Sequence, residues 1–187
     1  MSRVSQAEAQ ANRQRVVEAA ARLFRERGVA NVSVVDVMEA VGLTQGGFYK
    51  QFASKDALVV EAEAKGFGDM LQYLAGLDAD HGGHEAALGA LYDTYLSADH
   101  RDAPGSGCPA AGFGGDVARE PEWRAAYAAG VRDMADWVAP GKTGLAGLAT
   151  LVGGIILARA TAGSPLSEEI LEAVRDTAAP GAEATPR

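Results

Sequence analysis

Hydrogen-bonding side chains gather in one short stretch of the chain, TQGGFYK. Thr44 and Gln45 carry a hydroxyl and an amide, which suit hydrogen bonds to base edges in a nucleic-acid groove. Tyr49 and Lys50 carry a hydroxyl and an ammonium that suit phosphate oxygens. Lys55 stands at the start of another predicted helix, where backbone N–H groups already favour an anion. The stretch therefore predicts a surface that contacts nucleic acid.

Two short helices joined by a tight turn are the elements that would position these side chains. Ser33 and Asp36 have the types and spacing of a capping box at the start of the first helix. Gly42 stands where the chain must reverse, and glycine enters the left-handed conformation without a Cβ penalty. Thr44 is suited to cap the second helix, which we expect over residues 45–51. This layout is a helix-turn-helix, which presents its second helix to the major groove of DNA.

The two glycines of the second helix are informative. Gly46 and Gly47 each cost about 1 kcal/mol relative to alanine in a helix. A helix selected only for stability would not contain both, whereas a helix that approaches another surface closely tolerates them. Phe48 and Phe52 are spaced i, i+4 and are expected to pack inward.

Each of these residues taken alone is also compatible with an ordinary turn or solvated surface. The ordered set, however, favours DNA contact. The predicted DNA-binding residues are Ser33, Val34, Thr44, Gln45, Gly46, Gly47, Tyr49, Lys50 and Lys55.

Residues 13–60 resemble the N-terminal domain of the TetR family of repressors. The resemblance rests on AARLFRERG, on Ser33-Val34 through Asp36, on VGLT, on GFY and on FASKDAL. It covers about a quarter of the chain directly. It implies an all-α homodimer with a three-helix DNA-binding head and a larger body that binds a small-molecule effector and dimerises.

The caps and this resemblance together predict a helix-turn-helix DNA-binding domain over residues 1–54 and a helical ligand-binding and dimerisation domain over 55–178. A disordered tail is expected at 179–187. The net charge of −8 is unevenly distributed. Residues 1–65 hold nine Lys and Arg against eight Asp and Glu, a net charge of +1, and residues 66–187 hold eight against seventeen, a net charge of −9. A nearly neutral head predicts DNA binding through a few placed contacts with little non-specific retention.

The single cysteine excludes an intrachain disulfide and fits a reducing cytoplasm. The longest uncharged run, between Lys142 and Arg159, has sixteen residues. That is short of the roughly 20 residues that cross a bilayer. We therefore expect a soluble cytoplasmic protein with no membrane partner and no cofactor. Asp78, Asp80, His81 and His84 have metal-ligand types, but the intervening Gly82-Gly83 favours a solvated turn over a metal site.

Caps, breaks and apolar spacing predict the remaining elements. The first helix is expected to follow a loose arm at residues 1–4 and a Ser5 cap, to bury Val16, Ala20, Leu23 and Phe24, and to end at Gly28. Beyond it we expect a long helix from Lys55 through Leu74, a turn at 78–83, and a helix with Leu88, Leu91, Tyr92, Tyr95 and Leu96 on one face. A loop at 100–107 should precede helices that start at Pro109 and at Pro121. After a break at Pro140-Gly141 we expect an apolar segment over 145–156 that is buried on more than one side, and a last helix that begins at Ser164-Pro165.

Aromatic residues of the middle helices and the single cysteine are candidates for a ligand cavity, although such stripes are more often solid core. The candidates are Phe67, Tyr92, Tyr95, Cys108, Phe113, Trp123 and Tyr127. Cys108 precedes a proline at the start of a helix, where the helix dipole would lower the thiol pKa and make an oxidant or electrophile sensor. The alternative is a buried cysteine that acts as a small hydrophobe.

The last two helices are the expected dimer interface, because two such helices and their symmetry mates form a four-helix arrangement. The alternative is that their apolar residues complete an internal core. The candidates are Leu148, Leu151, Val152, Ile155, Leu166, Ile170 and Val174.

Three functions follow from these patterns. The first is a ligand-responsive repressor that binds a pseudo-palindromic operator as a homodimer. The second is an enzyme that uses Cys108 with His100 as base, for which no orienting group or oxyanion donor is apparent. The third is a helical interaction module that does not read DNA. The first is favoured, and we expect no catalytic residues.

Overall fold

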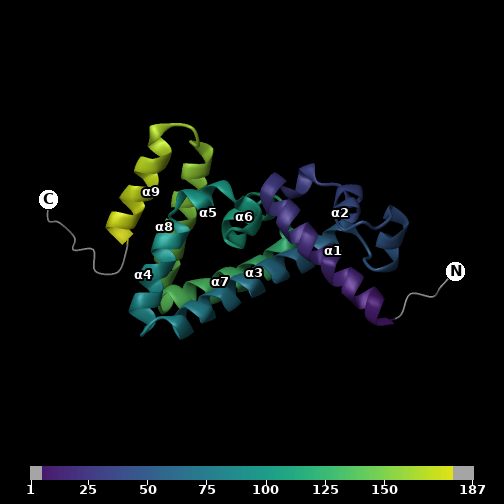
Figure 1. Ribbon diagram of the computed structural model, residues 1–187, viewed down its shortest axis with the longest axis horizontal. Helices are drawn as coiled ribbons and strands as arrows, with labels where there is room; N and C mark the ends of the chain where they lie inside the picture. The colour runs from purple at the N-terminus through teal and green to yellow at the C-terminus, as the bar shows by residue number, and fades with distance from the viewer. Residues whose placement is uncertain (1–5, 179–187) are drawn as a thin grey trace.

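The computed structural model describes residues 6–178, and every regular element within them is an α-helix or a short 3₁₀ helix (Figure 1). The all-α class is therefore confirmed. The predicted arm at 1–4, the Ser5 cap and the predicted tail at 179–187 lie outside the described residues. The α-helices are α1 (Gln6–Arg27), α2 (Val34–Ala40), α3 (Lys55–Asp80), α4 (His84–Tyr95), α5 (Ala98–Asp102), α6 (Pro109–Val117), α7 (Arg124–Val138), α8 (Gly141–Ala160) and α9 (Pro165–Ala178); the 3₁₀ helices are η1 (Val29–Asn31), η2 (Gln45–Lys50), η3 (Pro104–Ser106) and η4 (Pro121–Trp123).

The head comprises α1, α2, η2 and the first turns of α3, which pack around one apolar cluster. Phe24, Phe48 and Leu58 are fully buried in it. Phe113 and Trp123, from distant segments, belong to the same cluster. α3 begins at the predicted domain boundary. We define the body as the remainder of α3 and all later elements. The apolar cluster of the head continues across this boundary, because Phe113 and Trp123 belong to it.

Local signals set the helix ends of the head as predicted. The Ser33 hydroxyl accepts from the Asp36 N–H at 3.1 Å, and the Asp36 carboxylate accepts from the Ser33 N–H at 2.7 Å, so the capping box is present. Gly28 and Gly42 have φ angles of 78° and 70°, in the left-handed region. The Ser54 hydroxyl caps α3 by accepting a backbone N–H of its first turn.

The second helix of the helix-turn-helix differs from the prediction. It is the 3₁₀ helix η2 rather than an α-helix, and the Gly47 N–H donates to the Thr44 carbonyl at 3.0 Å. The Thr44 side chain precedes η2 but makes no capping hydrogen bond. A six-residue segment with two glycines has little helix propensity, so the shorter hydrogen-bond pattern forms instead.

The long helix α3 joins the head to the body, and α7 packs along it (Figure 1). The two helices approach closely at Gly130 of α7, where an added Cβ would lie 2.2 Å from the ring of Phe67. The absence of a side chain at this position therefore lets the Phe67 ring pack directly on the α7 backbone.

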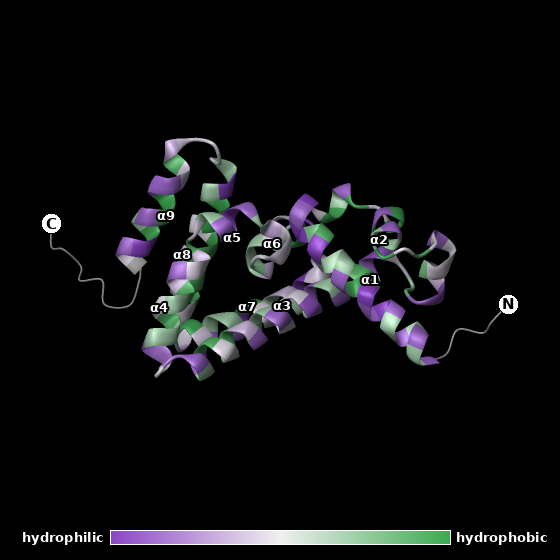
Figure 2. Ribbon diagram, viewed as in Figure 1, coloured by the Kyte–Doolittle hydropathy of each residue, from purple (hydrophilic) through white to green (hydrophobic). Residues whose placement is uncertain are grey.

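α8 and α9 pack against each other at the end of the body away from α1 and α2 (Figure 1). Figure 2 shows α8 mainly in white and green, whereas α9 alternates hydrophilic with hydrophobic residues. α8 buries Leu148, Leu151 and Ile155 but leaves Ile156 and Leu157 exposed. The prediction that this segment is buried on more than one side is therefore wrong for the single chain, because only one face of α8 meets the body core.

Two predicted loops contain helix. α3 extends to Asp80 instead of ending near 78, and the Asp78 carboxylate there accepts from Trp137 Nε1 at 2.7 Å. The predicted loop at 100–107 overlaps α5 and contains η3, and the Ser97 hydroxyl caps α5 by accepting from the His100 N–H at 3.2 Å. The contact between Asp78 and Trp137 spans 59 positions, so local sequence patterns did not reveal it.

Within the described residues one helix, α8, has the length and mean hydropathy of a membrane span. The run counted from the sequence was shorter because it stopped at Lys142 and Arg159, both of which lie inside the helix. The face carrying Leu148, Leu151 and Ile155 packs in the body core, as the face of a core helix does.

Candidate nucleic-acid interface

The η2 surface, which we define as Thr44, Gln45, Gly46, Tyr49 and Lys50, is exposed on the head. The Tyr49 side chain is 66% exposed. Beneath this surface, the fully buried Phe48 ring stacks on the Phe52 ring with centroids 5.2 Å apart. The predicted inward packing of both phenylalanines is confirmed, and it holds the polar residues of η2 outward.

The glycines of η2 are not required by packing inside the molecule. An added Cβ at Gly46 would meet no atom within 4 Å, and one at Gly47 would lie 3.6 Å from the Met38 methyl, an ordinary contact. Neither residue has a positive φ. The lack of a side chain at the exposed Gly46 therefore leaves the backbone open on the solvent side, where another surface can approach it closely.

The remaining predicted head residues are held by internal contacts. The Ser33 hydroxyl donates to the Asp36 carboxylate at 2.6 Å, which is the main reason that the Asp36 pKa is lowered. Val34 is half-buried against the head core. Lys55 Nζ donates to the Val29 carbonyl at 2.6 Å and lies 5.9 Å from the centroid of the Phe24 ring. The Lys55 ammonium thus fastens η1 to α3, a role that the sequence did not predict.

Arg13 supports the η2 surface from α1, and the sequence analysis missed it. Its guanidinium lies 4.7 Å from the centroid of the Phe52 ring and pairs with Glu61 at 2.6 Å. Both partners come from α3 or the turn before it, so no local spacing pointed to this contact.

The head is joined to the body by two polar contacts that also escaped prediction. Arg25 of α1 donates from Nε and Nη2 to the Gly105 carbonyl at 2.9 and 2.5 Å. The Val29 N–H donates to the Asp116 carboxylate of α6 at 2.9 Å. Both contacts link residues at least 80 positions apart.

A cleft of about 430 Å³ lies next to this junction. Of the predicted ligand-binding residues, only Tyr95 lines it; Phe67, Tyr92, Phe113 and Trp123 are buried in the apolar clusters, and the Tyr127 hydroxyl donates to the Ala110 carbonyl at 2.7 Å. The lining residues are Arg25, Gly66, Asp69, Met70, Tyr73, Leu91, Thr94, Tyr95, His100, Ser106 and Gly107.

Cys108 precedes α6, but its thiol has the opposite character to that of a sensor. The residue is fully buried, and burial raises the pKa of the thiol. This contradicts the lowered pKa of the sensor hypothesis and agrees with the alternative of a buried cysteine that acts as a small hydrophobe. His100 is not a base for this thiol, because its Nδ1–H donates to the Tyr95 carbonyl at 2.7 Å and its Nε2 accepts from the Cys108 backbone N–H at 3.1 Å. Burial also lowers the His100 pKa. The two hydrogen bonds of His100 stabilise the conformation of the chain between α5 and α6.

Glu63 of α3 is a buried carboxylate that the sequence analysis missed. It is fully buried, and neither carboxylate oxygen has a hydrogen-bond partner among the described residues. Burial raises its pKa to about 7. Its spacing of four from both Val59 and Phe67, which are buried, was the signal that placed it on the inner face.

The candidate metal ligands form an ordinary hydrogen-bonded turn. His84 Nδ1 contacts the Asp78 carboxylate at 2.9 Å, and this hydrogen bond raises the His84 pKa and lowers the Asp78 pKa. The His84 ring meets Trp137 edge to face. Within residues 6–178 no group of three or more His, Cys, Asp and Glu side chains has metal-site geometry.

The candidate dimer residues divide into two groups. Leu148, Leu151 and Ile155 lie in the internal core and cannot present an intermolecular surface, which corrects that part of the prediction. Leu166 is 48% exposed, and Val152, Ile170 and Val174 are half-buried. Ile156 and Leu157, which were not among the candidates, are exposed on α8.

An all-α chain with a capped helix, a glycine turn and an exposed second helix belongs to the helix-turn-helix class. The family of bacterial regulatory proteins named for tetR matches residues 16–62. The HTH-type transcriptional regulator TtgR of Pseudomonas putida is 42% identical over 59 residues, 32% of this chain and 28% of TtgR. AcrR of Shigella flexneri is 33% identical over 84 residues, 43% of this chain and 39% of AcrR. The matched segment thus spans well under half of each of these relatives.

Solved structures extend the likeness to the whole fold. The reduced form of NemR from E. coli has a TM-score of 0.73 at 19% identity, covering 88% of this chain and 95% of that one. A TetR-family regulator from Chloroflexus aurantiacus has a TM-score of 0.74 at 22% identity, covering 93% and 95%. Residues 16–62 thus match the N-terminal segment of the TetR family, and the solved structures share the fold of the chain beyond this segment. The geometry does not support the cysteine-enzyme alternative, because Cys108 is fully buried and both ring nitrogens of His100 are hydrogen-bonded to backbone groups.

Proposed function

We propose that this protein is a cytoplasmic, ligand-responsive repressor that binds a pseudo-palindromic DNA operator as a homodimer. The observation that carries the proposal is the η2 surface. Its polar side chains face solvent, and an added Cβ at Gly46 or Gly47 would overlap no atom of the molecule. A surface built in this way suits close contact with a groove, with Thr44 and Gln45 at base edges and Tyr49 and Lys50 on phosphates.

DNA from immediately upstream of the protein's own coding sequence tests this proposal. We expect saturable binding that survives excess non-specific competitor and weakens as salt rises, because phosphate contacts release counterions. Tyr49→Ala and Lys50→Ala should weaken binding to all sequences similarly, while Gln45→Ala should change the sequence preference. Binding without any sequence preference would favour the alternative of an interaction module.

Lys55 needs a different control. We retain the expectation that Lys55→Ala weakens binding across sequences, but this change also removes the hydrogen bond to Val29. Its effect on the melting temperature must therefore be measured beside DNA affinity. Lys50 is exposed and provides the cleaner test of a phosphate contact.

Dimerisation is supported by apolar side chains left exposed on α8 and α9. Ile156, Leu157 and Leu166 are between 43% and 56% exposed in the single chain. Ile156 and Leu157 are adjacent, and exposed apolar residues that lie together are typical of protein interfaces. Sedimentation should show a dimer at micromolar concentration that Leu157→Glu dissociates, while Val35→Glu, at an exposed apolar residue of the head, leaves it intact.

The ligand response is assigned to a small molecule rather than to modification of Cys108. The fully buried thiol with a raised pKa has little thiolate to react. Release of DNA by electrophiles that is abolished by Cys108→Ser would reverse this assignment.

A further inference from the structure

Arg25 crosses from the head to the body through a passage formed by two glycines. An added Cβ at Gly66 of α3 would lie 2.6 Å from Arg25 Nη1, and one at Gly112 of α6 would lie 2.6 Å from Arg25 Cγ. The side chain fits only because both positions lack a Cβ. It ends at the Gly105 carbonyl. The guanidinium of a head residue is therefore placed in the body.

This guanidinium has no directly paired carboxylate among the described residues, and Asp69 is the strongest favourable charge near it. No carboxylate within residues 6–178 forms an ion pair with it: the nearby Asp69 pairs with Lys65 at 2.5 Å, and Glu26 pairs with Arg22 at 3.1 Å. The hydrogen bonds of Arg25 in this part of the chain go to one neutral carbonyl. Burial lowers the Arg25 pKa, although a guanidinium stays protonated in proteins. A half-buried cation with no directly paired carboxylate is costly, and an anionic ligand would relieve that cost.

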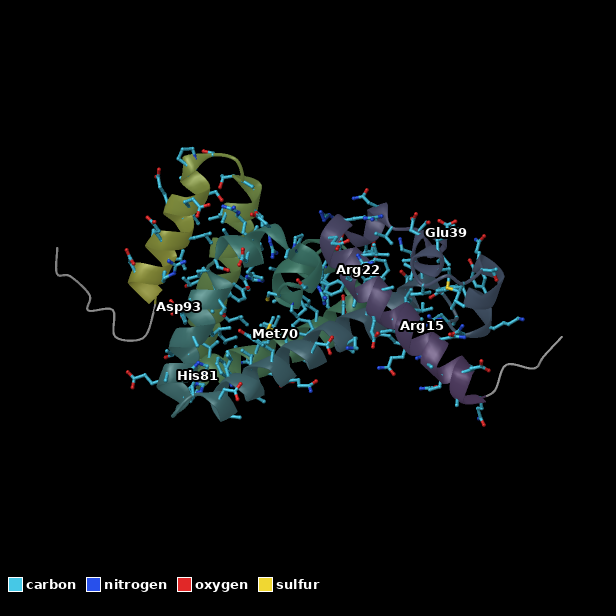
Figure 3. All side chains as sticks on the ribbon, viewed as in Figure 1. Arg15, Arg22, Glu39, Met70, His81 and Asp93 are labelled. Carbon is cyan, nitrogen blue, oxygen red and sulfur yellow. The ribbon has the colours of Figure 1, made fainter. Side chains whose placement is uncertain are left out.

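The cleft beside Arg25 has the size and lining of a small-molecule site. Its volume of about 430 Å³ is within the usual range for such sites. Met70, Leu91 and the Tyr95 ring supply apolar surface, and Met70 lies near the centre of the molecule (Figure 3). The Tyr95 hydroxyl is buried next to the Cys108 thiol.

We infer that this cleft binds a small amphipathic carboxylate, with its carboxylate on Arg25 and its aromatic or branched apolar part on Met70, Leu91 and Tyr95. The inference rests on the ligand response proposed above. Asp69 also lines the cleft, but it is exposed and pairs with Lys65, so it attracts a cationic ligand less than the half-buried Arg25 attracts an anion. A bound carboxylate competes with the Gly105 carbonyl for the Arg25 donors. It therefore acts directly on one of the contacts that join α1 to the body.

Three matched probes test the charge preference on the full-length protein without DNA: naphthoate, naphthamide and naphthylmethylamine. Calorimetry should show saturable naphthoate binding about tenfold tighter than naphthamide, as expected for a charge-assisted pair, with the amine weakest. Equal affinities, the reverse order, or no saturable naphthoate binding up to millimolar concentration would overturn the inference.

Two variants assign the preference to residues. Arg25→Gln should reduce naphthoate affinity about tenfold and leave naphthamide affinity unchanged. Arg22→Gln, on the same helix and exposed, is the control and should change neither (Figure 3). Because Arg25→Gln also loosens the junction, Asp69→Asn provides a test at an exposed position: it should tighten naphthoate binding a few-fold. Weaker naphthoate binding in Asp69→Asn would count against an anionic ligand.

The site and the proposed function fail separately. Operator binding is measured on the same preparations without any probe. If the protein binds the carboxylate probe through Arg25 but does not bind its upstream DNA, the proposed regulator function is contradicted and the proposed ligand site is supported. If the protein binds its operator but shows no preference for the carboxylate probe, the proposed regulator function is supported and the proposed ligand site is contradicted.

Discussion

Glycines serve opposite purposes at the head surface and at the close contacts between packed helices. At Gly46 an added side chain meets nothing in the molecule, whereas at Gly66, Gly112 and Gly130 it would overlap Arg25 or Phe67. The first glycine keeps a surface open to an outside partner. The other three let distant parts of the same chain approach each other.

This difference teaches how to separate function from folding at a single residue type. A substitution at the η2 surface should change binding with little effect on stability. A substitution at one of these close helix contacts should mainly lower the free energy of unfolding, because the space there is already filled. The following predictions test that contrast.

The largest effect is expected at Glu63, the buried carboxylate of α3. Its pKa rises from an ordinary 4.5 to about 7, so the folded chain holds a proton that the unfolded chain has released. Stability should therefore fall as the pH rises from 4.5 to about 7, by about 3 kcal/mol in total. Glu63→Gln removes this pH dependence. In urea unfolding, the variant and the wild-type protein should therefore be similarly stable at about pH 5, and the variant should be the more stable of the two at about pH 8.

Glu61→Gln is the matched control two residues earlier on the same helix. Glu61 is partly exposed and pairs with Arg13 at 2.6 Å, so its removal should cost less than about 1 kcal/mol at either pH. A wild-type protein whose stability does not fall between these pH values would show that Glu63 is not a buried, unpaired carboxylate.

The next effect is at Gly130, where α7 meets the Phe67 ring. Gly130→Ala places a Cβ 2.2 Å from that ring and should destabilise the chain by about 2 kcal/mol through overpacking. Gly68→Ala on α3, where a Cβ meets nothing within 4 Å, should instead be neutral or stabilising. Thermal unfolding of the two variants decides the point, and equal melting temperatures would contradict the close approach.

The smallest effect on stability, and the sharpest on binding, is expected for Gly46→Ala. The added methyl meets no internal atom, so stability should change by less than about 1 kcal/mol, with a gain if η2 becomes more helical. Operator affinity should nevertheless fall about tenfold, because the methyl keeps the backbone away from the groove. Unchanged affinity would mean that this glycine does not face DNA.

The sequence was most informative where a structural signal lies within a few residues. The capping box of Ser33 and Asp36, the left-handed Gly42 and the inward Phe48 and Phe52 all follow from spacing and residue type. The 3₁₀ form of η2 did not follow, because helix propensity is weak over six residues and the surrounding packing selects the hydrogen-bond pattern. Most of the predicted ligand residues proved to be core, since an apolar stripe does not reveal whether a cavity lies next to it.

By itself the sequence determined the helical class, the helix-turn-helix layout and the residues that η2 exposes, because these depend on contacts between near neighbours in the chain. Only the tertiary structure decided the rest: that Lys55 binds Val29, that Arg25 reaches Gly105, that Cys108 is sealed from solvent and that Leu148 is core rather than interface. The physical reason is that these outcomes depend on which helices pack together. Such contacts join residues up to 87 positions apart, and no local periodicity encodes them.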